Sequence, residues 1–532
     1  MVLISTGRKN IILSSQFEKR LQALRTSGGA RLIAGGQRGI EKESLRIEPS
    51  GLVAQTGHQR ALGSALTNRY ITTDYSEALL EFVTPPEKSA WAATQFLCDI
   101  HQYIYQAIGD ELLWPFSMPC RLHSEDDIPL ARYGTSNIAQ MKTIYRSGLG
   151  YRYGKYMQVI SGIHFNYSVP EIFWSAWSGI EKTDKTEEQL RSDSYLGLVR
   201  NVHRLDWLLL YLFGASPAVC KSFLAGQENN LSEFDSGTCY GEWATSLRMS
   251  DLGYQNSNQS VLTVSTNSLE EYVRDLSAAI RTPNPDYVEI GVKNNGKYLQ
   301  LNSNQLQIEN EYYSTIRPKR VARSGERPTT ALRRGGVEYV ELRALDLSPF
   351  DPVGIGQQQQ KFLEAFLLYC LLIDSPPIDG NEQQAMRANH LAVAREGRKP
   401  GLQLRRAGTE TGLQEWASGI CNQMQPVCEM LDEGEGDGYL DSLQAQQAAI
   451  DDPGLTPSAR LLVDLRDVDI PFADYGLGVA RDYRDYFLGL GEEFNQHHEL
   501  FETESNESLQ RQQQIESQDD VDLDAYLRRY YA

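Results

Sequence analysis

The sequence is poor in cysteine, and its cysteines lack the spacing of zinc sites. The seven cysteines among the 532 residues are scattered and include no CxxC pair. Structural zinc sites and disulfide frameworks rely on closely spaced or evenly paired cysteines. We therefore expect mostly buried free thiols, with neither a zinc site nor structural disulfides.

Long apolar runs are also missing. The sequence contains no uncharged apolar stretch of about 18 residues, the length that a membrane helix needs. Its first residues, MVLISTGRKN, lack the apolar segment of a secretion signal. These absences predict a protein without a membrane partner and with a cytoplasmic location.

Basic residues are outnumbered by acidic ones. The chain has 51 Lys and Arg against 70 Asp and Glu, which gives a formal net charge of -19. Nucleic acids are bound by clustered Lys and Arg, so this balance argues against a nucleic-acid partner. Nucleotides remain compatible with it, because divalent ions held by carboxylates supply the positive charge that phosphates need.

Strand-like and helical patterns divide the chain unevenly. From about residue 33 to 354 alternating runs recur between helical ones, whereas from about 355 to 532 helical patterns dominate. The apolar run FLEAFLLYCLLI, residues 362–373, predicts a buried helix, and the Glu- and Gln-rich stretch 491–520 predicts a solvated helix or a frayed tail. We expect an α+β fold in which residues 1–532 form one large unit with a mainly antiparallel sheet.

The run GGQRGIEKESLRI, residues 35–47, alternates like a strand but carries two glutamates on an apolar face. Counting by twos, Glu41 and Glu43 share a face with Leu45 and Ile47. The other face takes Lys42, Ser44 and Arg46. A half-buried strand normally turns its carboxylates to water, so this arrangement requires an explanation.

Two further runs show the same inversion. In GGVEYVELRALDLSPF, Glu341 and Arg343 fall on one face among apolar neighbours. In SGIHFNYSV one face is wholly polar and includes His164. An Arg beside a Glu is commonly a structural ion pair, and a lone His is commonly a hydrogen-bonded core residue, so neither run alone identifies a site.

The stretch TTDYSEALLEFVTP is ambiguous between strand and helix. It carries Asp74, Glu77 and Glu81. As a strand it aligns Glu77 and Glu81 with apolar residues, and as a helix it makes them neighbours four residues apart. In either form it adds carboxylates to an apolar surface.

Taken together, these acidic groups indicate a metal site. A solvated strand face explains any single glutamate, but buried carboxylates are tolerated only when they are paired, hydrogen-bonded or metal-bound. Oxygen donors with one imidazole and no thiolate suit two or three Mg²⁺ ions, or Mn²⁺, better than zinc. The candidate ligands are Glu41, Glu43, Asp74, Glu81, His164 and Glu341.

Several stretches in a fixed order resemble the proteobacterial type of glutamate–cysteine ligase. The resemblance is dense from about residue 34 to 354 and thinner afterwards, where EGRKPGLQL is the best local match. The stretches that carry it are QRGIEKESLRI, ITTDYSEALLEFVTP, YGTSN, SGIHFNYSVP, YLFGASPAVC, ATSLRMSDLGYQN, NSNQLQIENEYYSTIRPKR and GGVEYVELRALDLSPF.

The resemblance implies a fold and a reaction. The fold is related to the catalytic part of glutamine synthetase, in which a curved antiparallel sheet forms a funnel around the site, so that Glu41 and Glu43 would point inward. ATP, the co-substrate, phosphorylates the γ-carboxylate of L-glutamate, and the amine of L-cysteine then displaces phosphate. A γ-glutamyl ligase for another amine, or a non-catalytic nucleotide- or metal-binding protein on the same scaffold, remains an alternative.

The resemblance also implies roles for particular residues. Five of the six candidate ligands match metal positions of the family, and we expect Asp74 to belong with them. Arg343 would contact the transferring phosphoryl group, and Arg146 is a weaker candidate for that role. The cysteine pocket would comprise Tyr145, Arg248, Tyr254 and Tyr313. The basic stretch IRPKR, residues 316–320, is either a nucleotide contact or a solvated loop.

Overall fold

The computed structural model describes residues 15–224, 227–253, 262–323, 325–436 and 438–531. At its centre lies a seven-stranded sheet in which every pairing is antiparallel. The strand order is β11 (Ile316–Lys319), β12 (Tyr339–Leu345), β5 (Ile163–Ser168), β1 (Gln37–Ile47), β3 (Leu79–Val83) and β2 (Ile71–Thr73), with β4 (Leu112–Leu113) pairing with the end of β1. This architecture confirms the predicted α+β class.

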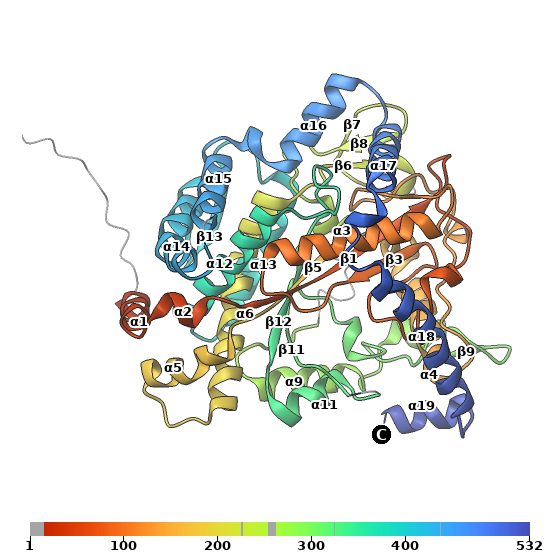
Figure 1. Cartoon of the computed structure of the whole chain (residues 1–532), viewed down its shortest axis with the longest axis horizontal. Coiled ribbons are helices and arrows are strands. Elements are labelled where there is room, and N and C mark those ends of the chain that lie inside the picture. The colour runs from red at the N-terminus through yellow and green to blue at the C-terminus, as the bar shows by residue number, and fades with distance from the viewer. Residues whose placement is uncertain (1–14, 225–226, 254–261, 324, 437, 532) are drawn as a thin grey trace, which may run out of the picture.

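Helices cover the sheet and extend beyond it on both sides (Figure 1). In the first part of the chain they are α1 (Ser15–Thr26), α2 (Gly29–Ile33), α3 (Ala90–Ala107), α4 (Asn137–Tyr153), α5 (Glu171–Glu181), α6 (Glu187–Phe213), α7 (Lys221–Leu224), α9 (Leu269–Ala279), α10 (Pro285–Ile290) and α11 (Pro328–Gly335). Short strands complete this part: β6 (Ala218–Cys220), β7 (Ser232–Glu233), β8 (Thr238–Tyr240), β9 (Lys293–Asn294) and β10 (Lys297–Tyr298).

The later part of the chain is mainly helical, as predicted. It comprises α12 (Gln357–Leu372), α13 (Gly380–Glu396), α14 (Leu413–Glu435), α15 (Tyr439–Asp451), α16 (Pro457–Val468), α17 (Phe472–Gly489), α18 (His498–Ser517) and α19 (Leu523–Tyr531), with a hairpin of β13 (Gln403–Arg406) and β14 (Thr409–Gly412). Helix α12 is buried along most of its length, which confirms the helix predicted at 362–373. In the Glu- and Gln-rich stretch, α18 buries Phe501, Glu504 and Ser508, so it is a packed helix rather than a frayed tail.

Strand β1 is largely buried on both faces, unlike an ordinary half-buried strand with one face in water. On the face opposite the glutamates, Arg38, Lys42 and Arg46 are all buried. Each has a partner on a neighbouring segment: Arg38 pairs with Glu364 at 2.8 Å, Lys42 Nζ lies 2.6 Å from His101 Nε2, and Arg46 pairs with Glu111. Helix α3, whose first turn is capped by Ser89, and helix α12 cover this face, so the polar side chains there are buried by partners rather than exposed to water.

The cysteines are mostly buried free thiols, as the sequence predicts. All seven cysteines are free thiols, six of them buried and Cys98 partly buried. Within the described ranges, every helix is too short or too polar to cross a bilayer.

Candidate active site

Neighbouring strands bring Glu41 and His164 together. Glu41 of β1 is the register partner of His164 of β5, so their side chains lie on the same face of the sheet. Glu41 Oε2 lies 3.0 Å from His164 Nδ1, and Glu41 Oε1 accepts a hydrogen bond of 3.0 Å from Asn166 Nδ2. The polar face that the sequence predicted for 163–169 therefore meets the glutamate face of β1.

On the other side of β1, Glu81 joins the same group. Residues 79–83 form strand β3, which resolves the ambiguity between strand and helix. The possible ligand atoms of Glu41, Glu81 and His164 all lie within 4.8 Å of one another. Burial, together with the charges of Glu41, Asp74 and Glu43, raises the pKa of Glu81 well above its ordinary value. Carboxylates gathered in this way need a cation or a proton between them.

Glu77, which the sequence placed beside Glu81, lies outside the strand and serves the loops. Its carboxylate accepts hydrogen bonds from the backbone N–H groups of His58, at 2.7 Å, and Arg132, at 2.8 Å. Its role in the structure is to fix two loop segments.

Glu341 on β12 lies between cations and is almost completely buried, with 1% of its surface exposed. Its Oε1 lies 3.2 Å from Arg343 Nη1 and 3.3 Å from Lys319 Nζ. Burial alone would raise the pKa of Glu341, but Lys319, Arg343 and His164 hold it well below its ordinary value. Its Oε2 is buried without a hydrogen-bond partner among the described residues. A buried, ionised carboxylate oxygen without a partner is a suitable metal ligand.

Arg343 links Glu341 to His164. Its Nη1 is 3.2 Å from Glu341 and 3.4 Å from His164 Nδ1. Its backbone N–H donates to Thr315 O at 2.7 Å, and its carbonyl accepts from Arg248 Nη2 at 3.0 Å. Contacts of both the main chain and the side chain of Arg343 therefore hold its guanidinium on the same face as the candidate metal ligands.

Asp74 and Arg146 form a neighbouring pair at the β2 end of the sheet. Asp74 lies in the turn between β2 and β3, and its Oδ1 is 3.7 Å from Arg146 Nη2. The guanidinium of Arg146 also donates to the carbonyl of Asp74 and stacks 4.6 Å from the ring centre of Tyr133. Asp74 is thus paired with Arg146, and the negative charge of Asp74 also contributes to the raised pKa of Glu81.

The residues assigned to a cysteine pocket come from separate segments of the chain. Arg248 and Tyr313 meet at Met249, whose Sδ lies 3.1 Å from Arg248 Nη1 and 3.2 Å from Tyr313 Oη. Arg248 is buried and ion-paired with Asp346 at 3.6 Å. Tyr145 lies on α4, next to Arg146. Tyr254 falls outside the described residues.

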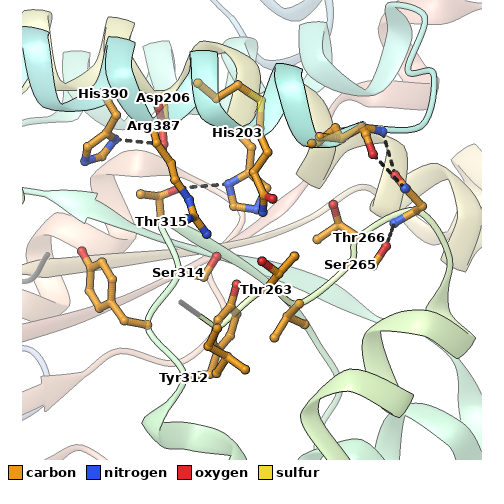
Figure 2. A pocket seen from close by; sticks show the side chains of 18 of the residues that line it. His203, Asp206, Thr263, Ser265, Thr266, Tyr312, Ser314, Thr315, Arg387 and His390 are labelled. Atoms are coloured by element: carbon orange, nitrogen blue, oxygen red, sulfur yellow. Dashed lines mark hydrogen bonds and ion pairs between the residues drawn. The ribbon is translucent and has the colours of Figure 1, made fainter. Parts of the chain in front are cut away.

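A cavity of about 370 Å³ adjoins Tyr313, between helices α6 and α13 and the segments 262–267 and 312–315 (Figure 2). In its wall the Thr315 hydroxyl donates to Asp206 at 3.0 Å and lies 3.2 Å from His203 Nδ1. His390 contacts Asp206 through Nδ1 at 3.1 Å and the carbonyl of Met249 through Nε2 at 3.2 Å.

Sequence reasoning missed this cavity, and it gave Lys319 only as part of the basic stretch 316–320, either a nucleotide contact or a solvated loop. The cavity residues come from two helices and two loops, whose spacing gives no common periodic signal. Lys319 belongs to strand β11 rather than to a basic loop, and its register partner is Tyr339 on β12. A count by twos places Lys319 and Arg317 on one face of their strand, but only the pairing of β11 with β12 brings that face beside Glu341.

Comparisons with known proteins agree on one family. The family profile for glutamate–cysteine ligase matches residues 21–393. The chain is 49% identical over 520 residues to the glutamate–cysteine ligase of Alcanivorax borkumensis, covering 97% of this chain and 99% of that protein. It is 47% identical over 495 residues to that of Pseudomonas putida, covering 93% and 94%. A crystal structure of the Francisella tularensis glutamate–cysteine ligase in complex with AMP superposes with a TM-score of 0.88 at 36% identity, covering 94% of this chain and 98% of that one.

Proposed function

The chain belongs to the glutamate–cysteine ligase family and is an ATP-dependent ligase of the first step of glutathione biosynthesis, and we propose that it joins L-glutamate to L-cysteine at the site around Glu41, His164 and Glu341. Joining a carboxylate to an amine in water is unfavourable, so the γ-carboxylate must first be activated. A γ-carboxylate oxygen attacks the γ-phosphorus of ATP, and the bond to ADP breaks. The amine of cysteine then attacks the acyl carbon, loses a proton, and expels inorganic phosphate.

The donor set fits divalent cations. Glu41, Glu81 and His164 converge, and Glu341 has a buried oxygen without a partner in the described part of the chain. We propose that these residues, with Glu43 and Asp74, hold two or three Mg²⁺ ions, with Mn²⁺ as a possible substitute. When bound, such ions neutralise the phosphates and the carboxylate and so allow two anions to approach each other.

Arg343 is the proposed contact for the transferring phosphoryl group. Its planar guanidinium offers several donors to phosphoryl oxygens, and its position is fixed by Glu341 at 3.2 Å and by its own backbone contacts. Lys319 brings a second cation to the same carboxylate, at 3.3 Å, and we add it to the phosphate side of the site. Arg146, paired with Asp74, is better placed to bind an amino-acid substrate at the β2 end.

The acceptor side is proposed to lie around Tyr313, Arg248 and Tyr145. Arg248 and Tyr313 are both in contact with Met249, and Arg248 also contacts the carbonyl of Arg343. An amine bound there would lie close to the strand that carries the phosphoryl contact. We keep Tyr254 in the proposed pocket on the strength of the family resemblance.

The observation that best supports this proposal is the meeting of Glu41, His164, Glu341 and Arg343 on one face of the sheet. A protein that only binds nucleotide or metal has no need for a guanidinium fixed beside the metal ligands. The test is ADP release with glutamate and Mg²⁺, comparing L-cysteine with 2-aminobutyrate and a panel of other amines. A strong preference for cysteine supports the proposal, and a preference for another amine supports the alternative ligase. If no amine leads to ADP release, both are contradicted.

A further inference from the structure

Helix α19 packs against α4, the helix that carries Tyr145 and Arg146. Leu527 of α19 is 6% exposed and lies in a small apolar cluster with Met141 of α4 and Leu301. Tyr145 packs against the same cluster. In Figure 1 the two helices lie together at one edge of the molecule. Residues nearly 400 positions apart in the sequence are thus packed within one cluster beside the proposed substrate site.

Hydrogen bonds connect Tyr531 of α19 to the backbone of Tyr145 through Gln307. The hydroxyl of Tyr531 donates to Gln307 O at 2.7 Å, and Gln307 Nε2 donates to Tyr145 O at 3.1 Å. The fit around Gln307 is close, because a Cβ atom at Gly148 would lie 2.1 Å from its Oε1. Gln307 therefore packs closely against the turn of α4 that carries Tyr145 and Arg146.

The segment before α19 is anchored at the start of α4. Asp519 accepts a hydrogen bond of 2.6 Å from the backbone N–H of Asn137, and Val521 O accepts one of 2.9 Å from Asn137 Nδ2. Asp524 in the first turn of α19 binds Lys293 at 2.9 Å and the hydroxyl of Tyr298. Residues 519–531 therefore contact the start of α4 and several points of the segment 293–307. We name residues 519–531 the latch segment.

We propose that the latch segment is a positioning element of the ligase, which holds α4 so that Tyr145 and Arg146 meet the amino-acid substrates. The inference rests on the proposed function of those two residues. Active-site side chains lose rate steeply when they are displaced by about 1 Å. The metal side is supported differently, because Glu41 and Glu341 lie on strands fixed by sheet register. The latch should therefore affect amino-acid binding much more than Mg²⁺ dependence, because Asp74 is the proposed ligand that contacts Arg146 of α4.

The test compares Tyr531→Phe, Leu527→Ala and a chain without residues 519–532. A matched control is Arg529→Ala, since Arg529 forms an exposed pair with Asp520 at 3.6 Å. Losing the Tyr531 hydrogen bond, worth about 1 kcal/mol, should raise the KM for cysteine about fivefold, and truncation should raise it further. The KM for Mg·ATP and the Mg²⁺ midpoint should stay within about twofold of the wild type. Equal rises for all substrates, or no rise in the truncated chain, would overturn the proposal.

A second measurement is independent of turnover. Hydrogen exchange of the peptide 141–153 should become faster in Tyr531→Phe and in the truncated chain, while that of 37–47 in β1 should be unchanged. Unchanged exchange in 141–153 would also overturn the proposal. If the wild type showed no turnover with cysteine, the proposed function would fail, whereas the exchange data would still decide whether the latch orders α4.

Discussion

Glu43 on β1 and Glu81 on β3 are register partners, so two carboxylates face each other directly across an antiparallel strand pair. Like charges at such positions are destabilising, and both groups lie beside further acidic residues. One carboxylate oxygen of Glu43 has a hydrogen-bond donor, because its Oε2 accepts a hydrogen bond of 2.7 Å from the backbone N–H of Gly162. The pairing is understandable in a protein that binds a cation between the two strands.

Mg²⁺ alone should therefore stabilise the protein, without any nucleotide. A ligand present at 100 times its Kd adds about 2.7 kcal/mol to the free energy of unfolding. Glu81→Gln should have two effects of opposite sign: a higher melting temperature in EDTA, because repulsion is removed, and a smaller rise on adding Mg²⁺. Thermal melts with a Mg²⁺ titration measure both. A full Mg²⁺ response in the variant would exclude Glu81 as a ligand.

Glu341→Gln should abolish ligation while leaving the protein folded. The change keeps the side-chain volume but removes the charge from a carboxylate whose Oε2 is the proposed metal ligand. Turnover should fall by at least about a hundredfold, as expected when a directly acting group is removed. The control is Glu410→Gln, an exposed glutamate on β14. Activity close to that of the wild type at ordinary Mg²⁺ concentrations would remove Glu341 from the site.

Local spacing was sufficient to predict which side chains share a face. A count by twos places Glu41 with Glu43, and Glu341 with Arg343, because alternation depends only on neighbours in the chain. It could not show that β1 lies between β5 and β3, or that Glu41 is opposite His164. Strand order and register are set by long-range packing, which leaves no trace in a single strand.

The packing of α18 could not be predicted because the residues on its buried face give a weak sequence pattern. The face of α18 that packs on residues 63–69 buries Ser505 and Ser508, and small polar residues give no apolar periodicity. Gly63 approaches this face so closely that a Cβ there would lie 2.4 Å from Ser508 Oγ. A composition rich in Glu and Gln therefore predicted a solvated helix or a frayed tail, and the structure shows a helix whose small residues allow one face to pack closely.

Arg248→Met should affect both stability and acceptor binding. Arg248 is buried with Asp346 at 3.6 Å, and removing one partner of a buried pair costs about 3–5 kcal/mol. The KM for cysteine should rise more than that for glutamate or ATP if Arg248 also binds the acceptor. The double variant Arg248→Met/Asp346→Asn separates the two effects: it should regain much of the stability and keep the raised KM. If the KM for cysteine recovered with stability, Arg248 would be purely structural.

His390 should make stability depend on pH. Its two ring nitrogens face two oxygen atoms, Asp206 Oδ2 at 3.1 Å and Met249 O at 3.2 Å, so the protonated imidazole can donate to both. Burial alone would lower the pKa of His390, but the charge of Asp206 and these hydrogen bonds raise it above its ordinary value. The stabilisation is thus complete below about pH 6.5 and is lost as the pH rises through the raised pKa.

The measurement for this prediction is the melting temperature from about pH 6 to 9 for the wild type and His390→Gln, a range that spans the ordinary pKa of histidine. The difference between the two proteins should be larger at the acidic end and shrink toward the alkaline end. His123→Gln, at an exposed histidine, serves as the control. A difference that is constant with pH would show that folding leaves the pKa of His390 unchanged, and a difference that grew toward the alkaline end would show that folding lowers it.

Arg343→Lys separates a ligase from a protein that only binds nucleotide. If the guanidinium stabilises charge on the transferring phosphoryl group, lysine should reduce kcat by about 10²–10³, because a single ammonium cannot reproduce the planar set of donors. Nucleotide affinity should change much less, since the carboxylate-bound metals and Lys319 would still hold the phosphates. An arginine that only pairs with Glu341, at 3.2 Å, would behave differently: lysine would keep part of the ion pair, and the loss would appear as lower stability. A thermal melt, a Mg·ATP titration and steady-state turnover on one preparation distinguish these cases. Unchanged turnover with a lowered melting temperature would remove Arg343 from the mechanism, and with it the main argument for catalysis at this face of the sheet.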